Sequence, residues 1–326
     1  MTNTTHQFVE QICQGSRLWL ARAITLTEST LREHRDQAED ILAALLPKTG
    51  HSLRLAISGP PGVGKSSFIE AIGKTLILRG KKVAVLAIDP SSPITGGSIL
   101  GDKTRMEDLA KSEACFIRPS PSSGALGGVS RHTREAILLC DAAGYDIILV
   151  ETVGIGQSEI VAASMTDLFI QLHQPLSGDE LQGIKKGVME LADLLVITKA
   201  DGETMKPAEL ARHDLLRALS LTHTDSELRP QVTLVSAHSG KGIQEVLELL
   251  DELAAKRKHN GTFEARRHHQ TRDWLTQEIS NELQSLLTSH PLYEPTLKAA
   301  FTQVDKSGEH CGRAARKLVA LLLKQC

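Results

Sequence analysis

Short apolar runs alternate with amphipathic stretches from residue 53 to about residue 240. The runs are LRLAIS (53–58), KKVAVLAID (81–89), ACFIRP (114–119), DIILVE (146–151), DLFIQLH (167–173), DLLVITKAD (193–201) and QVTLVSA (231–237). A strand that is apolar throughout is buried on both faces, which favours a parallel sheet with helices on both sides. The pattern therefore predicts an α/β fold with a mostly parallel sheet.

Both flanks of this region read as helical. WLARAITLTES (19–29) and AEDILAALL (38–46) repeat apolar residues at helical spacing, and Pro47 with Gly50 closes the segment. The polar stretch KRKHNGTFEARRHHQTR (256–272) reads as a linker before a helical tail, with RRHH (266–269) on a solvated helix face. We predict an N-terminal helical extension at 1–50, the α/β domain at 51–258 and a C-terminal helical region at 259–326.

Composition narrows the function class. Lys plus Arg number 37 and Asp plus Glu number 39 in 326 residues, so the net charge of −2 provides no basic excess for nucleic acid. The five cysteines form no CxxC pair, which favours a reducing compartment. No basic start leads into an apolar block, and no stretch approaches eighteen apolar residues. We expect a cytoplasmic protein that binds neither nucleic acid nor membrane.

A phosphate-binding loop follows the first strand. GPPGVGKS (59–66) fits the pattern GxxxxGKS between a strand and an amphipathic helix, KSSFIEAIGKTLILRG. The glycines let backbone amides surround phosphates, the helix adds its positive end, and Lys65 adds a cation. The predicted nucleotide-binding residues here are Gly59, Pro60, Pro61, Gly62, Val63, Gly64, Lys65, Ser66 and Ser67.

The run ending in Thr198, Lys199, Ala200 and Asp201 resembles the NKxD base loop of GTPases. The Asp201 carboxylate would accept hydrogen bonds from guanine N1–H and its exocyclic amine, a donor pair that adenine lacks. Thr198 replaces the usual Asn. It keeps a hydroxyl but loses the amide that braces the loop and reaches guanine N7, so we expect lower nucleotide affinity. Ser236 and Ala237, after the last strand, occupy the place of the loop that faces the guanine oxygen.

Three acids are candidate Mg²⁺ ligands together with Ser66. Asp89 and Glu151 end strands, and Asp102 follows a glycine-rich loop. For two of these acids a capping role is the alternative to metal binding. Asp89 would cap a turn before Pro90, and Asp102 would be a helix N-cap. For Asp102 the metal and cap interpretations are close.

The stretch YDIILVETVGIGQSE (145–159) predicts a phosphate-sensing switch. Gly154 would donate its amide to the γ-phosphate, so that loss of this phosphate releases the loop. Ile155 follows Gly154 where a water-orienting Gln would stand, and Gln157 comes later. We therefore expect slow intrinsic hydrolysis that a partner accelerates.

Taken together, these motifs resemble the MeaB/ArgK family of P-loop GTPases. The match extends over roughly residues 53–240 in the family's order: GPPGVGKSS, AIDPSSPITGGSILGDKTRM, FIRPSPSSGALGG, VETVGIGQSE, GDELQGIKKGVMELADLLVITKADG and VSA. The resemblance implies a GTP-hydrolysing chaperone that associates with the adenosylcobalamin-dependent methylmalonyl-CoA mutase and gates cofactor loading or protection. It also implies a homodimer formed through the C-terminal helices.

The resemblance assigns roles to individual positions. Lys65, Asp89 and Glu151 would be catalytic; Ser66, Asp89, Asp102 and Glu151 would hold Mg²⁺; Gln182 and Lys185 would couple to the mutase. The chain contains no DxHxxG sequence, the His-bearing motif of many B12-binding domains, so we expect it to bind no cobalamin itself.

Other interpretations remain open from the sequence. An ATP-using kinase or ATPase of a lysine, arginine and ornithine transport system, a label this family has also carried, would not need Asp201. A nickel or cobalt metallochaperone GTPase would need Cys or His clusters. A non-enzymatic scaffold would not need intact Lys65 and Ser66. The partner could also be an isobutyryl-CoA or ethylmalonyl-CoA mutase.

Overall fold

The computed structural model describes residues 3–88, 106–120, 126–152, 157–175, 190–222 and 229–323. The predicted site residues Asp89, Asp102, Gly154, Gln182 and Lys185 lie outside these ranges. The chain divides into two compact units, Met1–Arg267 and His268–Cys326. No helix among the described residues is both long and apolar enough to cross a membrane.

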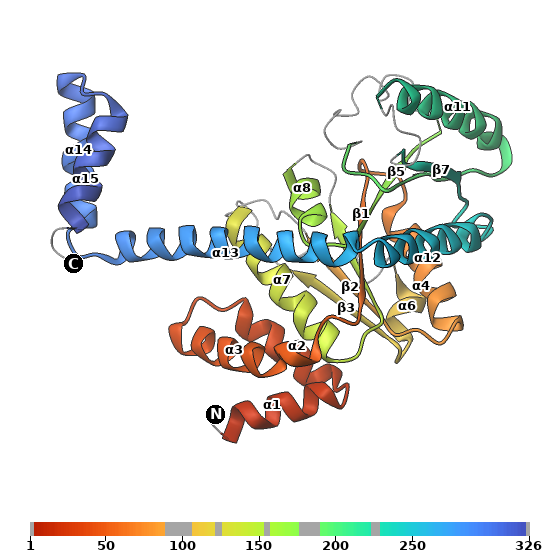
Figure 1. Cartoon of the computed structure of the whole chain (residues 1–326), viewed down its shortest axis with the longest axis horizontal. Coiled ribbons are helices and arrows are strands. Elements are labelled where there is room, and N and C mark those ends of the chain that lie inside the picture. Colours follow the sequence, from red (N-terminus) through yellow and green to blue (C-terminus); the bar gives the residue numbers. More distant parts are fainter. Residues whose placement is uncertain are drawn as a thin grey trace. The chain divides into compact units, whose positions relative to one another are not determined.

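The first unit contains a seven-stranded sheet in the order β3-β2-β4-β1-β5-β6-β7 (Figure 1). Every neighbouring pair is parallel, which confirms the predicted fold class. The strands are β1 (Leu53–Ser58), β2 (Val83–Ile88), β3 (Cys115–Ser120), β4 (Ile147–Thr152), β5 (Leu168–His173), β6 (Leu194–Ile197) and β7 (Gln231–Leu234). Each coincides with one of the apolar runs, and β3 and β4 extend one residue beyond theirs, because burial on both faces selects apolar residues at consecutive positions.

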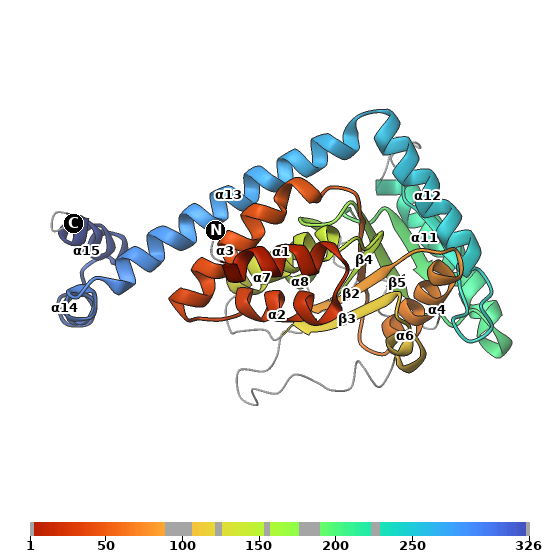
Figure 2. The ribbon, with the colours of Figure 1, turned by 90° about the horizontal axis from the view of Figure 1, so that it is seen from below.

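Helices cover both faces of the sheet. α4 (Lys65–Leu78), α6 (Glu107–Lys111) and α12 (Ile243–His259) share one apolar core with alternate strand residues. The core on the other face contains residues of α7 (Leu126–Ala142), α8 (Gln157–Ala163) and α11 (Met205–Thr222). The short helix η2 (Gly202–Thr204) directly precedes α11. Figure 2 shows β2 and β3 between α7 on one side and α4 and α6 on the other. Parallel strands place all their carboxyl ends at one edge, where the predicted site residues follow.

The N-terminal helices pack on α7. α1 (Asn3–Cys13), α2 (Arg17–Thr27), α3 (Arg32–Leu45) and the short helix η1 (Leu46–Lys48) bury Ile12, Leu20 and Ile41 in the core that α7 shares. Arg118 of β3 forms an ion pair with Glu28 at the end of α2. The extension therefore belongs to the same compact unit as the sheet.

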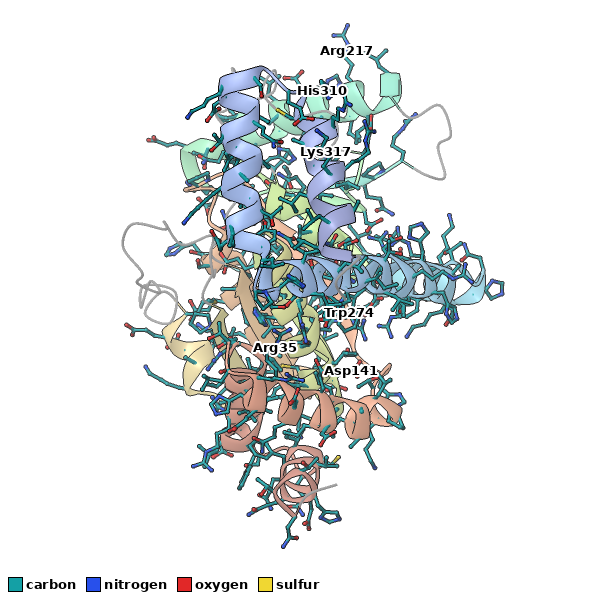
Figure 3. The ribbon with its side chains drawn as sticks, turned by 90° about the vertical axis from the view of Figure 1, so that its left-hand side faces the viewer. Arg35, Asp141, Arg217, Trp274, His310 and Lys317 are labelled. Carbon is teal, nitrogen blue, oxygen red and sulfur yellow. The ribbon has the colours of Figure 1, made fainter. Side chains whose placement is uncertain are left out.

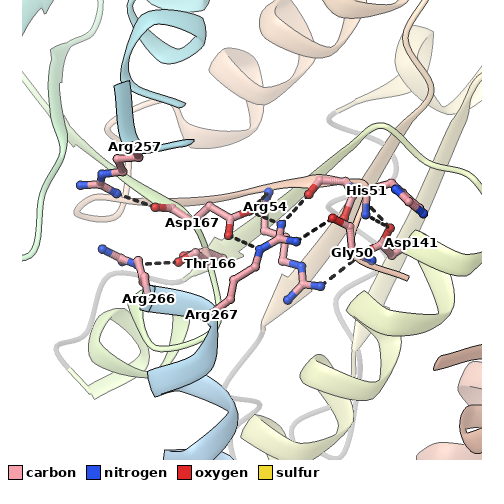
Figure 4. Close-up of polar contacts among 10 residues, drawn as sticks. Gly50, His51, Arg54, Asp141, Thr166, Asp167, Arg257, Arg266 and Arg267 are labelled. Atoms are coloured by element: carbon pink, nitrogen blue, oxygen red, sulfur yellow. Dashed lines mark hydrogen bonds and ion pairs between the residues drawn. The ribbon is translucent and has the colours of Figure 1, made fainter. Parts of the chain in front are cut away.

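The amino ends of the strands carry a network of buried charges (Figure 4). Asp141 accepts hydrogen bonds from the backbone N–H groups of Gly50, His51 and Ser52 at 2.8–3.2 Å, and from the Arg54 guanidinium at 3.3 Å. Burial acts to raise the pKa of Asp141, but the hydrogen bonds from Gly50 and Ser52 outweigh it, so this pKa lies below its ordinary value. Asp141 is therefore ionised at neutral pH and joins α7 to the start of β1.

The same network holds the start of α13 (Thr262–Ser289). Arg267 donates to both carboxylate oxygens of Asp167 at 2.7 Å and to the carbonyls of Gly50 and Ser52. Arg257, near the end of α12, forms an ion pair with Asp193. The linker predicted after residue 258 is therefore wrong, because Asn260 and Gly261 alone separate two helices. The first half of RRHH is half-buried and donates to Thr166 and Asp167, just before β5.

The second unit is helical. It contains the later part of α13, α14 (Tyr293–Ser307) and α15 (Cys311–Leu323), and Figure 3 shows α14 and α15 side by side. Lys317 of α15 donates to Glu309, just before that helix, at 2.5 Å. A largely apolar cavity of about 540 Å³ lies among the three helices. Its lining includes Leu287, Leu297, Phe301 and Leu318.

Candidate active site

The phosphate loop joins β1 to α4. Gly64 has φ of 96°, a left-handed conformation that favours glycine, and α4 begins at the next residue. Gly59 lies so close to β5 that a Cβ there would approach the Leu172 carbonyl oxygen and the Val63 side chain to 2.9 Å. Both glycines are therefore required by the backbone path, which brings the loop amides to the positive end of α4.

Lys65 and Ser66 begin α4 and face this loop. Lys65 Nζ donates to the carbonyls of Gly59 at 2.8 Å and Pro60 at 3.2 Å, so its ammonium lies over the loop that would hold phosphates. Ser66 Oγ lies 3.5 Å from Glu151 Oε1 at the end of β4. The structure thus brings together one hydroxyl and one carboxylate that were predicted independently as Mg²⁺ ligands.

These oxygen donors fit Mg²⁺, which prefers hard oxygen ligands and keeps several waters and phosphate oxygens in its shell. Glu151 is 7% exposed, so its carboxylate is held away from bulk solvent beside the loop. Among the described residues, no cluster of three or more His, Cys, Asp or Glu side chains could hold a metal ion. The remaining predicted ligands, Asp89 and Asp102, lie outside those residues.

The predicted base loop joins the phosphate loop directly. Lys199 Nζ donates to the Gly62 carbonyl at 2.8 Å, and Lys199 itself has φ of 55°, a conformation uncommon for a residue with a side chain. The Ser236 hydroxyl donates to Asp201 Oδ2, and the Ala200 amide donates to the Val235 carbonyl at 3.0 Å. The loops after β6 and β7 therefore form one surface with a carboxylate oriented by a hydroxyl.

Thr198 braces this arrangement. Its Oγ1 lies 2.6 Å from the Val63 carbonyl oxygen and 3.1 Å from the His173 carbonyl oxygen, and the side chain is buried. The hydroxyl that Thr198 keeps in place of the Asn amide therefore links the base loop to the phosphate loop. Its effect on nucleotide affinity stays a prediction.

A family model described as Methylmalonyl Co-A mutase-associated GTPase MeaB matches residues 20–291 of the chain. The chain belongs to the MeaB family of GTPases. It is a GTPase, with GTP as its substrate, and the family predicted from its motifs is confirmed.

Relatives of this MeaB-family chain cover most of its length. GTPase ArgK of Escherichia coli is 48% identical over 281 residues, covering 86% of this chain and 85% of the relative. A protein of Mus musculus described as methylmalonic aciduria type A homolog, mitochondrial, is 42% identical over 334 residues, covering 98% and 80%. A crystal structure described as LAO/AO transport system kinase has a TM-score of 0.77 and 36% identity, covering 99% of each chain.

Within this MeaB-family site, the sequence motifs did not reveal His173. It ends β5 beside Thr198, is 7% exposed, and its Nε2 has no hydrogen-bond partner among the described residues. Burial lowers the pKa of His173 from its ordinary value near 6.5 to about 4. The one available signal was its position at a strand end on the ligand-binding edge.

The lowered pKa of His173 predicts that the fold of this chain loses stability in acid. The unfolded chain protonates this side chain below pH 6.5 while the folded chain does not, so stability falls as pH decreases toward 4. Between pH 7 and pH 5 we expect this residue to remove about 2 kcal/mol from the free energy of unfolding. Urea unfolding of His173→Gln should show a shallower loss, whereas His213→Gln, on the exposed side of α11, should match the wild type. Equal losses in all three proteins would contradict the assignment.

Proposed function

We propose that this GTPase associates with an adenosylcobalamin-dependent acyl-CoA mutase, in the first place methylmalonyl-CoA mutase. In this proposal the nucleotide state gates loading or protection of the mutase's cofactor, and the chain itself binds no cobalamin. The description of the family model, which names association with that mutase, carries the proposal. The mouse relative supports it, because its description names methylmalonic aciduria.

The proposed chemistry uses the geometry at the carboxyl edge of the sheet. The loop amides and Lys65 neutralise the phosphates, while Asp201, oriented by Ser236, accepts the two guanine donors. Ser66 and Glu151, with Asp89 and Asp102, would hold Mg²⁺, which when bound neutralises charge that develops on the phosphates. Gly154 would sense the γ-phosphate, and hydrolysis would be slow until the mutase orders the switch segments.

We also propose a cytoplasmic homodimer formed through residues 259–326. Leu275, Ile279, Leu283 and Leu286 recur along α13 at spacings of four, four and three, so they share one helix face, and each is more than half exposed. Exposed apolar stripes of this kind favour association with another helical surface.

Sedimentation velocity tests both associations in one experiment. The chain is run alone and with each candidate mutase, in GDP and in a nonhydrolysable GTP analogue. We expect a dimer alone, and a mutase complex whose amount differs between the two nucleotides. A monomer would contradict the dimer, and failure to bind any candidate mutase in either nucleotide would contradict the partner.

The same samples test how the mutase is coupled. The amount of mutase complex in GDP should differ less from the amount in the GTP analogue when Lys185 is replaced by alanine. Lys206→Ala, on the exposed side of α11, should leave this difference unchanged. Single-turnover hydrolysis should accelerate with saturating mutase. An unchanged rate would contradict partner-dependent catalysis while leaving the GTPase assignment intact.

A further inference from the structure

Two arginines converge on the carboxyl end of α8, the helix that begins five residues after Thr152. Arg266 of α13 donates through Nε to the Thr166 carbonyl at 3.0 Å and through Nη2 to the Ala163 carbonyl at 3.1 Å. Arg134 of α7 donates to Ser164 Oγ at 2.9 Å. Cations at a helix carboxyl end interact favourably with its unpaired carbonyls and its dipole. The end of α8 is therefore held from two different helices.

The body of α8 is held weakly by comparison. The helix has seven residues, and the apolar side chains that it packs on the core are small: Ala162 and Ala163 are buried, and Val161 is partly buried. Ser158 and Glu159 are buried in its first turn. On the sheet face that α8 covers, Gln171 Oε1 and His173 Nε2 are buried without a hydrogen-bond partner among the described residues. Little apolar burial and incompletely paired polar groups characterise elements that move at low free-energy cost, so the position of α8 depends on its polar links.

α13 is held in a different way. Arg267 binds the Asp167 carboxylate and the carbonyls of Gly50 and Ser52, which lie at the amino edge of the sheet. The ring of Phe263, one helical turn earlier, is buried and lies 4.5 Å from the Arg267 guanidinium. Two consecutive residues thus attach α13 to neighbouring parts of the domain. Arg267 binds Asp167 at the sheet edge, and Arg266 binds the adjacent Thr166 carbonyl and, in addition, the Ala163 carbonyl at the end of α8.

We propose that Arg266 is a positioning residue that links α8 to α13, so that the nucleotide state at the phosphate loop is transmitted to the first turns of α13, residues 262–270. The coupling begins at Glu151, which ends β4 near Ser66. It continues through α8, and Arg266 connects the end of α8 to α13. The inference rests on the proposed assignment of Glu151 and the following segment as a nucleotide-sensing switch. Because coupling free energies are reciprocal, restraint of α13 would equally change nucleotide affinity.

Hydrogen exchange detected by mass spectrometry tests the link in the full chain, in GDP and in a nonhydrolysable GTP analogue. In the wild type we expect exchange of peptides within residues 262–270 to differ at least about threefold between the nucleotides. Arg266→Gln should abolish this difference while residues 59–66 keep their protection by nucleotide. Arg134→Gln is the matched control, because it removes a guanidinium from the same end of α8 but leaves the link to α13.

The outcomes separate the inference from the proposed site. Protection of residues 59–66 without any nucleotide-dependent difference at 262–270 in the wild type overturns the link and leaves the site intact. An equal loss in Arg134→Gln also overturns the assignment to Arg266. Lack of protection at 59–66 overturns the site, and the link with it. If Arg266→Gln unfolds at a markedly lower temperature than the wild type, Arg266→Lys takes its place. Lysine keeps the charge but not the planar guanidinium, so we expect a partial loss of the nucleotide-dependent exchange difference at 262–270. An unchanged difference would count against the link.

Discussion

Replacing Lys65 with alanine is expected to lower single-turnover GTP hydrolysis by at least about 100-fold, the scale for removing one group that stabilises transition-state charge. Lys65 Nζ lies over the phosphate loop and is bonded to the carbonyls of Gly59 and Pro60. The change removes the ammonium at the start of α4, and the other described cation at this loop, Lys199, is bonded to the Gly62 carbonyl instead. The β1–α4 backbone keeps its glycine-dependent path. Rapid-quench measurement of phosphate formation with excess enzyme reports the chemical step.

Lys74 provides the matched control for Lys65. It lies on the same helix, and its ion pairs with Glu70 and Asp108 are partly to largely exposed. Exposed pairs contribute little to stability, so Lys74→Ala should keep both the fold and the rate. A Lys65→Ala rate within about threefold of the Lys74→Ala rate would show that this ammonium does not act on the phosphates.

Asp201→Asn is expected to weaken GTP binding by about 100-fold and to raise affinity for xanthosine triphosphate. A carboxylate matches the two donors on guanine, whereas an amide presents one acceptor and one donor and so accommodates the carbonyl of xanthine. The Ser236 hydroxyl donates to Asp201 Oδ2, so the side chain is oriented for this readout. Titration with fluorescent analogues of both nucleotides measures the exchange of preference.

Asp214→Asn controls for removal of an acid from this region, because Asp214 lies on the exposed side of α11. It should bind both nucleotides as the wild type does. If Asp201→Asn loses affinity for GTP and xanthosine triphosphate to the same degree, the residue supports the loop without reading the base.

The strands and the phosphate loop could be predicted because their determinants are local in the chain. An apolar run specifies a strand buried on both faces, and the glycines of GPPGVGKS specify a backbone path whatever surrounds them. The convergence of Ser66 and Glu151 could also be anticipated, since parallel strands end at a common edge. Distances in that region depend on packing and became visible only in three dimensions.

The structure differed from prediction where a side chain acts through a distant partner. The residue type of Thr198 indicated a retained hydroxyl and a lost amide, but not that the hydroxyl bonds to a carbonyl on another loop, that of Val63. Arg266 and Arg267 resembled a solvated face because the surrounding stretch is polar, and the acid that pairs with Arg267, Asp167, lies 100 residues earlier. Charge patterning shows which charges exist, but not which of them meet.

The charge network at the amino ends of the strands has a consequence for synthesis of the chain. Asp167 and Asp193 precede their partners Arg267 and Arg257 by 100 and 64 residues. A nascent chain that stops short of α13 already contains Arg257 but lacks Arg267, so it would bury the Asp167 carboxylate without this cation, which costs several kcal/mol. The sheet domain should therefore finish folding only after residue 267 has left the ribosome, although its last strand ends at Leu234. The start of α13 therefore supplies the last buried ion pair that the preceding sheet domain needs to complete its folding.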